Sequence, residues 1–128
     1  MTGIFVDDTD VIDVSVVYRV GPDGKIEVSE SEKPGKDELS LTVKFARPDF
    51  ATSQRLLQAS TTVNAGGEQT VNFVQMQSNL LYALARDWDV KDKDGKKVPL
   101  DSNAISKLRV EIAKALIFQL ISKLGSIL

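Results

Sequence analysis

The spacing of apolar residues in this chain changes at Pro48 from every second residue to every third or fourth. Before Pro48, apolar side chains alternate with polar ones from Val11 to Val20 and from Leu39 to Ala46, which is the period of strands with one buried face. After Pro48, they recur at the spacing of amphipathic helices. One such change within 128 residues indicates a single α+β domain, residues 1–128, with one core.

The first part, about residues 11–46, is predicted to be an antiparallel three-stranded β-meander. Gly21–Gly24 contains a proline with a preset φ and glycines that tolerate positive φ, so the chain can reverse into a second strand that contains Ile26 and Val28. The polar stretch Ser29–Glu38 has too few apolar groups to offset the entropy of ordering. We therefore expect an exposed loop before the third strand.

The helical part, about residues 50–124, is predicted to contain two or three helices. A short helix near Phe50 is followed by a glycine-rich link at Ser60–Gly67 and by a broad apolar helix from about Thr70 to Trp88. The last helix is predicted to be long and apolar, from about Asn103 to Leu124, which corresponds to about 33 Å.

Composition excludes several kinds of chemistry. The chain has neither cysteine nor histidine, so thiolate catalysis, sulfur-based zinc sites and the commonest general base are absent. Its formal net charge is −2, and the basic residues are dispersed among acids, which argues against nucleic-acid binding. We find no signal peptide and no span of the ~20 apolar residues that a membrane requires. We therefore expect a soluble cytoplasmic protein without enzymatic activity, catalytic residues, cofactor or membrane contact.

Two acidic segments were weighed as metal sites. The turn from Asp89 to Gly95 resembles a calcium loop, but alignment on Gly95 puts Val90 at the first ligand position. Four lysines in the same loop would also repel a cation: Lys91, Lys93, Lys96 and Lys97. Carboxylates at the start of the chain could hold magnesium or manganese; they are Asp7, Asp8, Asp10 and Asp13. The favoured interpretations are a solvated turn and an unstructured acidic start, with Asp13 solvated on the polar face of the first strand, so no metal is predicted.

The last helix carries more apolar surface than a small sheet and two helices can cover, because apolar residues occupy most of its circumference. Self-association or capture of a partner helix would cover that surface; complete burial within the monomer is the alternative. Trp88 is predicted to be a core or interface anchor. The residues predicted to bind a partner or to pack are Leu81, Leu84, Trp88, Ile112, Leu116 and Leu120.

The segment from Tyr82 to Leu100 resembles the tail assembly chaperones of long-tailed bacteriophages. In that family a helix ends in a tryptophan-containing stretch, here Ala85-Arg86-Asp87-Trp88, and a charged Asp-Gly turn follows, here Asp92-Lys93-Asp94-Gly95. A Pro-Leu stop, here Val98-Pro99-Leu100, then leads into an apolar helix. The upstream Phe45-Ala46-Arg47-Pro48 is similar as well.

This resemblance implies a non-enzymatic protein of the host cytoplasm that coats the aggregation-prone tape measure protein, helps to recruit tail tube protein and leaves before the virion is complete. It also implies a homo-oligomer. Two other functions stay open from the sequence. One is a structural virion component, such as a head-to-tail connector or tail tip protein; the other is a small hydrolase that uses lysine or carboxylates.

Overall fold

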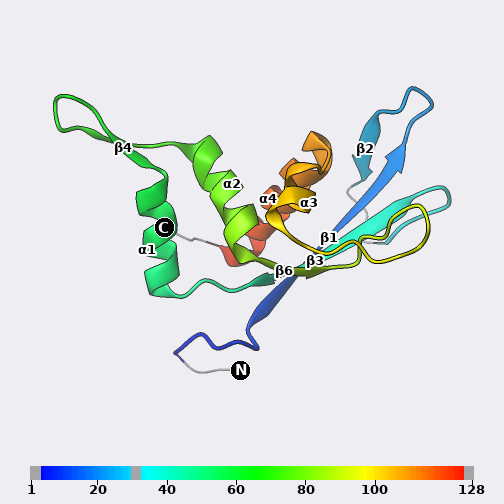
Figure 1. The fold of residues 1–128 in the computed structure, drawn as a ribbon, viewed down its shortest axis with the longest axis horizontal. Helices are drawn as coiled ribbons and strands as arrows, with labels where there is room; N and C mark the ends of the chain where they lie inside the picture. Colours follow the sequence, from blue (N-terminus) through cyan, green and yellow to red (C-terminus); the bar gives the residue numbers. More distant parts are fainter. Residues whose placement is uncertain (1–3, 30–32, 126–128) are drawn as a thin grey trace.

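A computed structural model describes residues 4–29 and 33–125 and shows a mixed α+β fold (Figure 1). The main sheet contains β1 (Val11–Val20), β2 (Ile26–Ser29), β3 (Leu39–Ala46) and β6 (Ala85–Trp88), and β4 (Thr61–Val63) and β5 (Gln69–Val71) form a separate hairpin. The helices are α1 (Phe50–Ala59), α2 (Phe73–Leu84), α3 (Ser102–Ser106) and α4 (Val110–Leu124). In Figure 1, α2, α3 and α4 all lie on one side of the sheet.

The three N-terminal strands form where the alternating pattern predicts them, but the predicted meander is wrong. The strand order is β2-β1-β3-β6, so β1 is central and β3 pairs with β1 instead of β2. All pairings in this sheet are antiparallel. The physical reason is length: β3 forms eight residue pairs along the ten-residue β1, whereas the four-residue β2 offers only half as many positions.

The predicted reversal between the first two strands is confirmed. The Gly24 amide donates to the Gly21 carbonyl at 3.0 Å, and Gly24 has a φ of +82°, which favours glycine. The loop predicted at Ser29–Glu38 is only partly observed, because residues 30–32 lie outside the described residues and Ser29 belongs to β2. Residues 33–38 include an exposed turn in which the Glu38 amide donates to Gly35 at 3.2 Å.

The helix predicted over about residues 70–88 is shorter, and its end is a strand. α2 begins after Asn72, whose side-chain oxygen accepts from the Gln75 amide at 3.1 Å. The chain then becomes extended at Ala85, and β6 pairs with β3. A further helical turn would satisfy only the backbone of these residues, whereas pairing with β3 also satisfies the open edge of the sheet. Tertiary contact therefore outweighs helix periodicity here.

The predicted link at Ser60–Gly67 contains more structure than expected. Three residue pairs join β4 to β5, and the Asn64 carboxamide oxygen accepts from the amides of Gly66 and Glu68 in the turn. This hairpin projects from the body between α1 and α2 (Figure 1). At its base, Ser60 is fully buried and its hydroxyl donates to the Leu56 carbonyl at 2.9 Å.

The single long C-terminal helix is not found. The chain forms the five-residue α3, a turn at Lys107 and Leu108, an extended residue, Arg109 (ψ 143°), and then the 15-residue α4. Arginine does not itself break helices. The Arg109 guanidinium, however, donates to the carbonyl of Gly24, in the β1–β2 turn, at 3.0 Å. The interruption therefore coincides with a long-range contact that local helix propensity does not include.

The core lies between the helices and the sheet. It joins the inward side chains of β1 and β3, such as Val14 and Phe45, to α2 and α4. The opposite face of the sheet is mainly polar: Lys44 lies 3.8 Å from Asp13, and the hydroxyls of Ser15 and Thr42 are 2.8 Å apart. Among the described residues, no helix combines the length and apolarity needed to cross a membrane.

Candidate functional site

The six residues predicted for partner contact are all in the core. None is more than 5% exposed, and three of them are completely or almost completely covered: Leu84 at 1%, Leu116 at 0% and Leu120 at 0%. They are buried because α2 and α4 turn their leucine-rich stripes toward the sheet. A partner could not reach these side chains without opening the core, so of the two predicted roles, packing and partner contact, their burial fits packing.

Trp88 anchors the segment that follows β6. Its side chain is 4% exposed, and its indole Nε1 donates to the Val98 carbonyl at 2.7 Å. The Val98 amide in turn donates to the Val90 carbonyl at 2.9 Å. Through these two bonds the tryptophan holds both ends of the charged turn against the core, which agrees with the predicted anchor role. Its location differs from the prediction, because Trp88 ends a strand instead of a helix.

On α2 and α4, several apolar side chains outside the core stripes reach solvent. Phe73 and Val74 on α2 are 66% and 75% exposed, and Phe118 on α4 is 75% exposed. Phe118 is two positions from both Leu116 and Leu120, which places it about 200° around the helix from them. A helical-wheel count could therefore have separated Phe118 from the core stripe before the structure was known.

A groove of about 590 Å³ runs between α2 and α4 on this outer side. It is lined by Gln77, Lys114, Ile117, Phe118, Ile121 and Ser122. Phe73 and Val74 share one helix face with Gln77, at spacings of four and three residues. We call Phe73, Val74, Gln77 and these α4 side chains the α2–α4 surface. Nothing in the sequence pattern indicated that Gln77 and Lys114 would belong to it.

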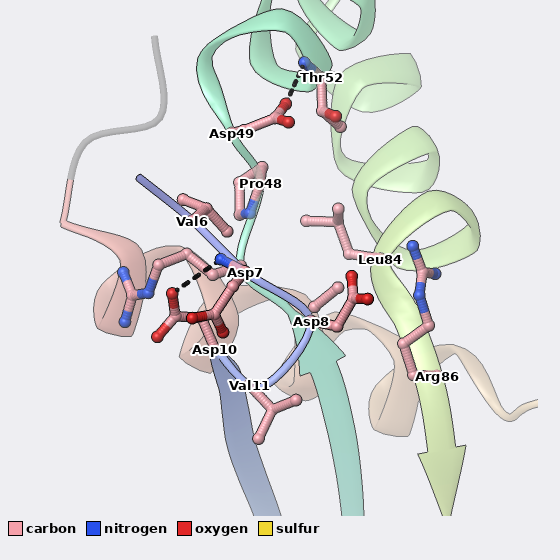
Figure 2. A pocket seen from close by; sticks show the side chains of 12 residues that line it. Val6, Asp7, Asp8, Asp10, Val11, Pro48, Asp49, Thr52, Leu84 and Arg86 are labelled. Carbon is pink, nitrogen blue, oxygen red and sulfur yellow. Dashed lines mark hydrogen bonds between the residues drawn. The ribbon is translucent and has the colours of Figure 1, made fainter. Parts of the chain in front are cut away.

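The carboxylates at the start of the chain surround a different pocket, of about 570 Å³ (Figure 2). Asp7 and Asp10 stabilise a local turn, because Asp7 accepts from Thr9 at 2.8 and 2.5 Å and Asp10 accepts from the Asp7 amide at 3.1 Å. The Thr9 hydroxyl bond lowers the pKa of Asp7 below its ordinary value. Arg86, which also lines this pocket, donates to the carbonyls at the end of α2.

Asp49, on the far side of the same pocket, caps α1. Its carboxylate accepts from the Thr52 amide at 2.8 Å, and this bond lowers the pKa of Asp49. Asp13 lies elsewhere, on the open face of the sheet beside Lys44. The carboxylates weighed as magnesium ligands are therefore divided between two locations. Across residues 4–29 and 33–125, no group of three or more acidic side chains is arranged to hold a metal.

The charged turn after β6 is a backbone reversal, as predicted. The Asp92 carboxylate accepts from the amides of Asp94 and Lys96 at 2.9 and 3.0 Å, and Gly95 has a φ of +80°. Lys97 lies 2.7 Å from Asp87, and this hydrogen bond lowers the pKa of Asp87. Asp92 thus orders the turn, and Asp87 pairs with Lys97 at its end.

Comparison with known proteins gives no further assignment: no protein-family model, curated protein or solved structure matches this chain.

Proposed function

We propose that this chain is a tail assembly chaperone of a long-tailed bacteriophage, which acts without catalysis and binds the tape measure protein through the α2–α4 surface. The observation that carries the proposal is the exposure of Phe118 at 75% beside a 590 Å³ groove. Exposed aromatic side chains that adjoin a concave apolar surface are typical of protein-binding sites. The resemblance of residues 82–100 to this family supports the same function.

The shape of the surface fits a helical client. An amphipathic helix binds a groove by placing side chains at spacings of three, four and seven residues into it. The α2–α4 groove offers Ile117, Phe118 and Ile121 as apolar contacts, with Lys114 and Gln77 at its border. A tape measure protein, which is long and helical in this family, would present such side chains along its length. The tail tube protein remains a second proposed partner, and the host cytoplasm the proposed location.

The proposal is tested by co-expression of the chain with the tape measure protein of the same genome. We expect the two to co-purify, and we expect Phe118→Glu to weaken capture by about tenfold or more, since a contact at the centre of an interface dominates binding. Phe50→Glu is the matched control, because Phe50 is 77% exposed on α1 and outside this groove. Equal capture by wild type and Phe118→Glu would contradict the proposed surface.

Mass spectrometry of purified virions tests the alternative of a structural component. A chaperone leaves before the particle is complete, so its peptides should be absent from mature virions and present in infected cells. Stoichiometric amounts in the virion would instead support a connector or tail tip protein and would refute the chaperone function.

A further inference from the structure

The segment before β1 combines exposed apolar and acidic side chains. Ile4 and Phe5 are 92% and 78% exposed, and Asp7, Asp8 and Asp10 follow them. None of these carboxylates lies within ion-pair distance of a cation in the part of the chain that the structure describes. We call residues 4–10 the acidic arm. The hydrogen bonds of its carboxylates stay within the arm, whose backbone is joined to the end of β3 by the bond from the Arg47 amide to the Asp10 carbonyl at 3.0 Å. The arm also lines the 570 Å³ pocket, which includes Arg47 and Arg86, but neither guanidinium forms an ion pair with it.

A groove that is lined mainly by basic and apolar side chains lies at the other end of the sheet. It has a volume of about 310 Å³, which suits one or two side chains. Its apolar lining includes Tyr18, Ile26 and Leu108, all half-buried. Its charged lining comprises Lys91, Lys107, Arg109 and one acid, Asp89, whose carboxylate already accepts from the Thr42 amide at 2.8 Å. We call it the cationic groove.

The cations of this groove are available for a partner. Lys91, Lys107 and Arg109 are exposed, and no described carboxylate lies within ion-pair distance of any of them. Arg109 uses one guanidinium nitrogen to donate to Gly24 and keeps its other donors. Three cations without an ion-pair partner among the described residues thus border apolar side chains. The acidic arm offers three carboxylates that form no ion pair among the described residues, two of which, Asp7 and Asp10, accept hydrogen bonds within the arm.

We propose that the acidic arm of one subunit docks into the cationic groove of a second copy of this chain. The arm cannot fill its own groove, because Val11 and Tyr18 are separated by seven residues of β1, about 23 Å. Residues 4–6 extend only about 10 Å beyond Asp7. The turn from Asp7 to Asp10 is closed by the 3.1 Å bond between the Asp10 amide and the Asp7 carbonyl.

Such docking joins two different surfaces, so it is a head-to-tail contact. Repetition of that contact gives a ring if the rotation closes and a filament if it does not. Figure 1 shows the segment before β1 and the β1–β2 turn at opposite ends of β1, so the arm and the cationic groove are separate surfaces. This docking would be the contact behind the self-association expected of the proposed function, and in that respect it rests on that function. The arm and the cationic groove are separate from the α2–α4 surface, so self-association and client binding can be tested independently.

The test measures the oligomeric state by sedimentation velocity. The wild type should self-associate, and raising NaCl from ~0.1 M to ~1 M should weaken association, because the Debye length falls from about 10 to about 3 Å. Lys107→Glu and Asp8→Lys should each weaken self-association by about 3- to 10-fold, and the double variant should restore it, since the ion pair is then reversed. Lys36→Glu, the same charge change outside the groove, should have no effect.

The apolar half of the contact has its own variant. Ile4→Ser combined with Phe5→Ser should abolish self-association without loss of folding, because both side chains are exposed. This variant should still capture the tape measure protein, which separates failure of the docking inference from failure of the proposed function. A wild type that sediments only as a 14.0 kDa monomer would overturn the inference. Self-association that persists in the Ile4/Phe5 variant, or that fails to recover in the charge-reversed double variant, would overturn it too.

Discussion

The orientation of α4 predicts opposite effects for two substitutions that are two residues apart. Leu116 is 0% exposed and belongs to the core, whereas Phe118 is 75% exposed. Leu116→Ala removes a fully buried side chain and leaves a cavity between α4 and the sheet, which costs about 3 kcal/mol. Phe118→Ala removes more atoms but only from the surface, so its cost should stay within about 0.5 kcal/mol.

Urea unfolding monitored by fluorescence measures this difference directly. Trp88 is the only tryptophan in the sequence and is 4% exposed, so its emission reports opening of the core. For a chain of 128 residues, about 3 kcal/mol corresponds to a fall in Tm of about 12 °C for Leu116→Ala. Equal destabilisation by the two variants, or a larger loss for Phe118→Ala, would refute the described orientation of α4. Neither substitution should change the urea m-value, since both retain the same fold.

Two further predictions concern single hydrogen bonds. Trp88→Phe removes the 2.7 Å bond to the Val98 carbonyl, so it should lower the unfolding free energy measured in urea by about 1–2 kcal/mol. It should also speed hydrogen exchange of the Val98 amide. Unchanged exchange at Val98 would contradict the anchor role of Trp88. Asp49 has a lowered pKa in the folded state because the Thr52 amide donates to its carboxylate. The stabilisation that this carboxylate gives the fold is present above the unfolded-state pKa, near 3.8, and is lost as the pH falls through the folded-state pKa. Asp49→Asn should therefore reduce the acid dependence of the unfolding free energy, and an unaltered profile between about pH 5 and pH 2 would argue against this cap.

The local spacing of apolar residues and glycines was sufficient to predict those elements whose tertiary contacts favour the same secondary structure as their own sequence. The alternation in Val11–Val20 and Leu39–Ala46 identifies both strands, because a pleated strand presents every second side chain to one face. The turn at Gly24 and the reversal at Gly95 were also readable, since both glycines occupy positive φ. Each of these features depends on residues that are close in the sequence.

The local sequence pattern gave the wrong secondary structure where a contact with a distant part of the chain decided the conformation. Residues 85–88 continue an apolar helical stripe, yet they form β6 because β3 offers an unpaired edge. Arg109 lies within an apolar helical pattern, yet it is extended and donates to Gly24. Strand order is likewise decided by the pairing of β1 with β3 across the intervening loop. None of these partners is visible in a window of ten to twenty residues.

The candidate site shows the same division. The sequence by itself determined that the chain has an α+β fold, that cysteine and histidine chemistry is absent and that α4 has more apolar residues than one face can bury. Only the tertiary structure decided which face is buried, because that depends on how α2 and α4 are rotated against the sheet. That rotation buries Leu116 and leaves Phe118 in solvent, and it moves the proposed binding surface from the leucine stripe to the opposite side of the same helix.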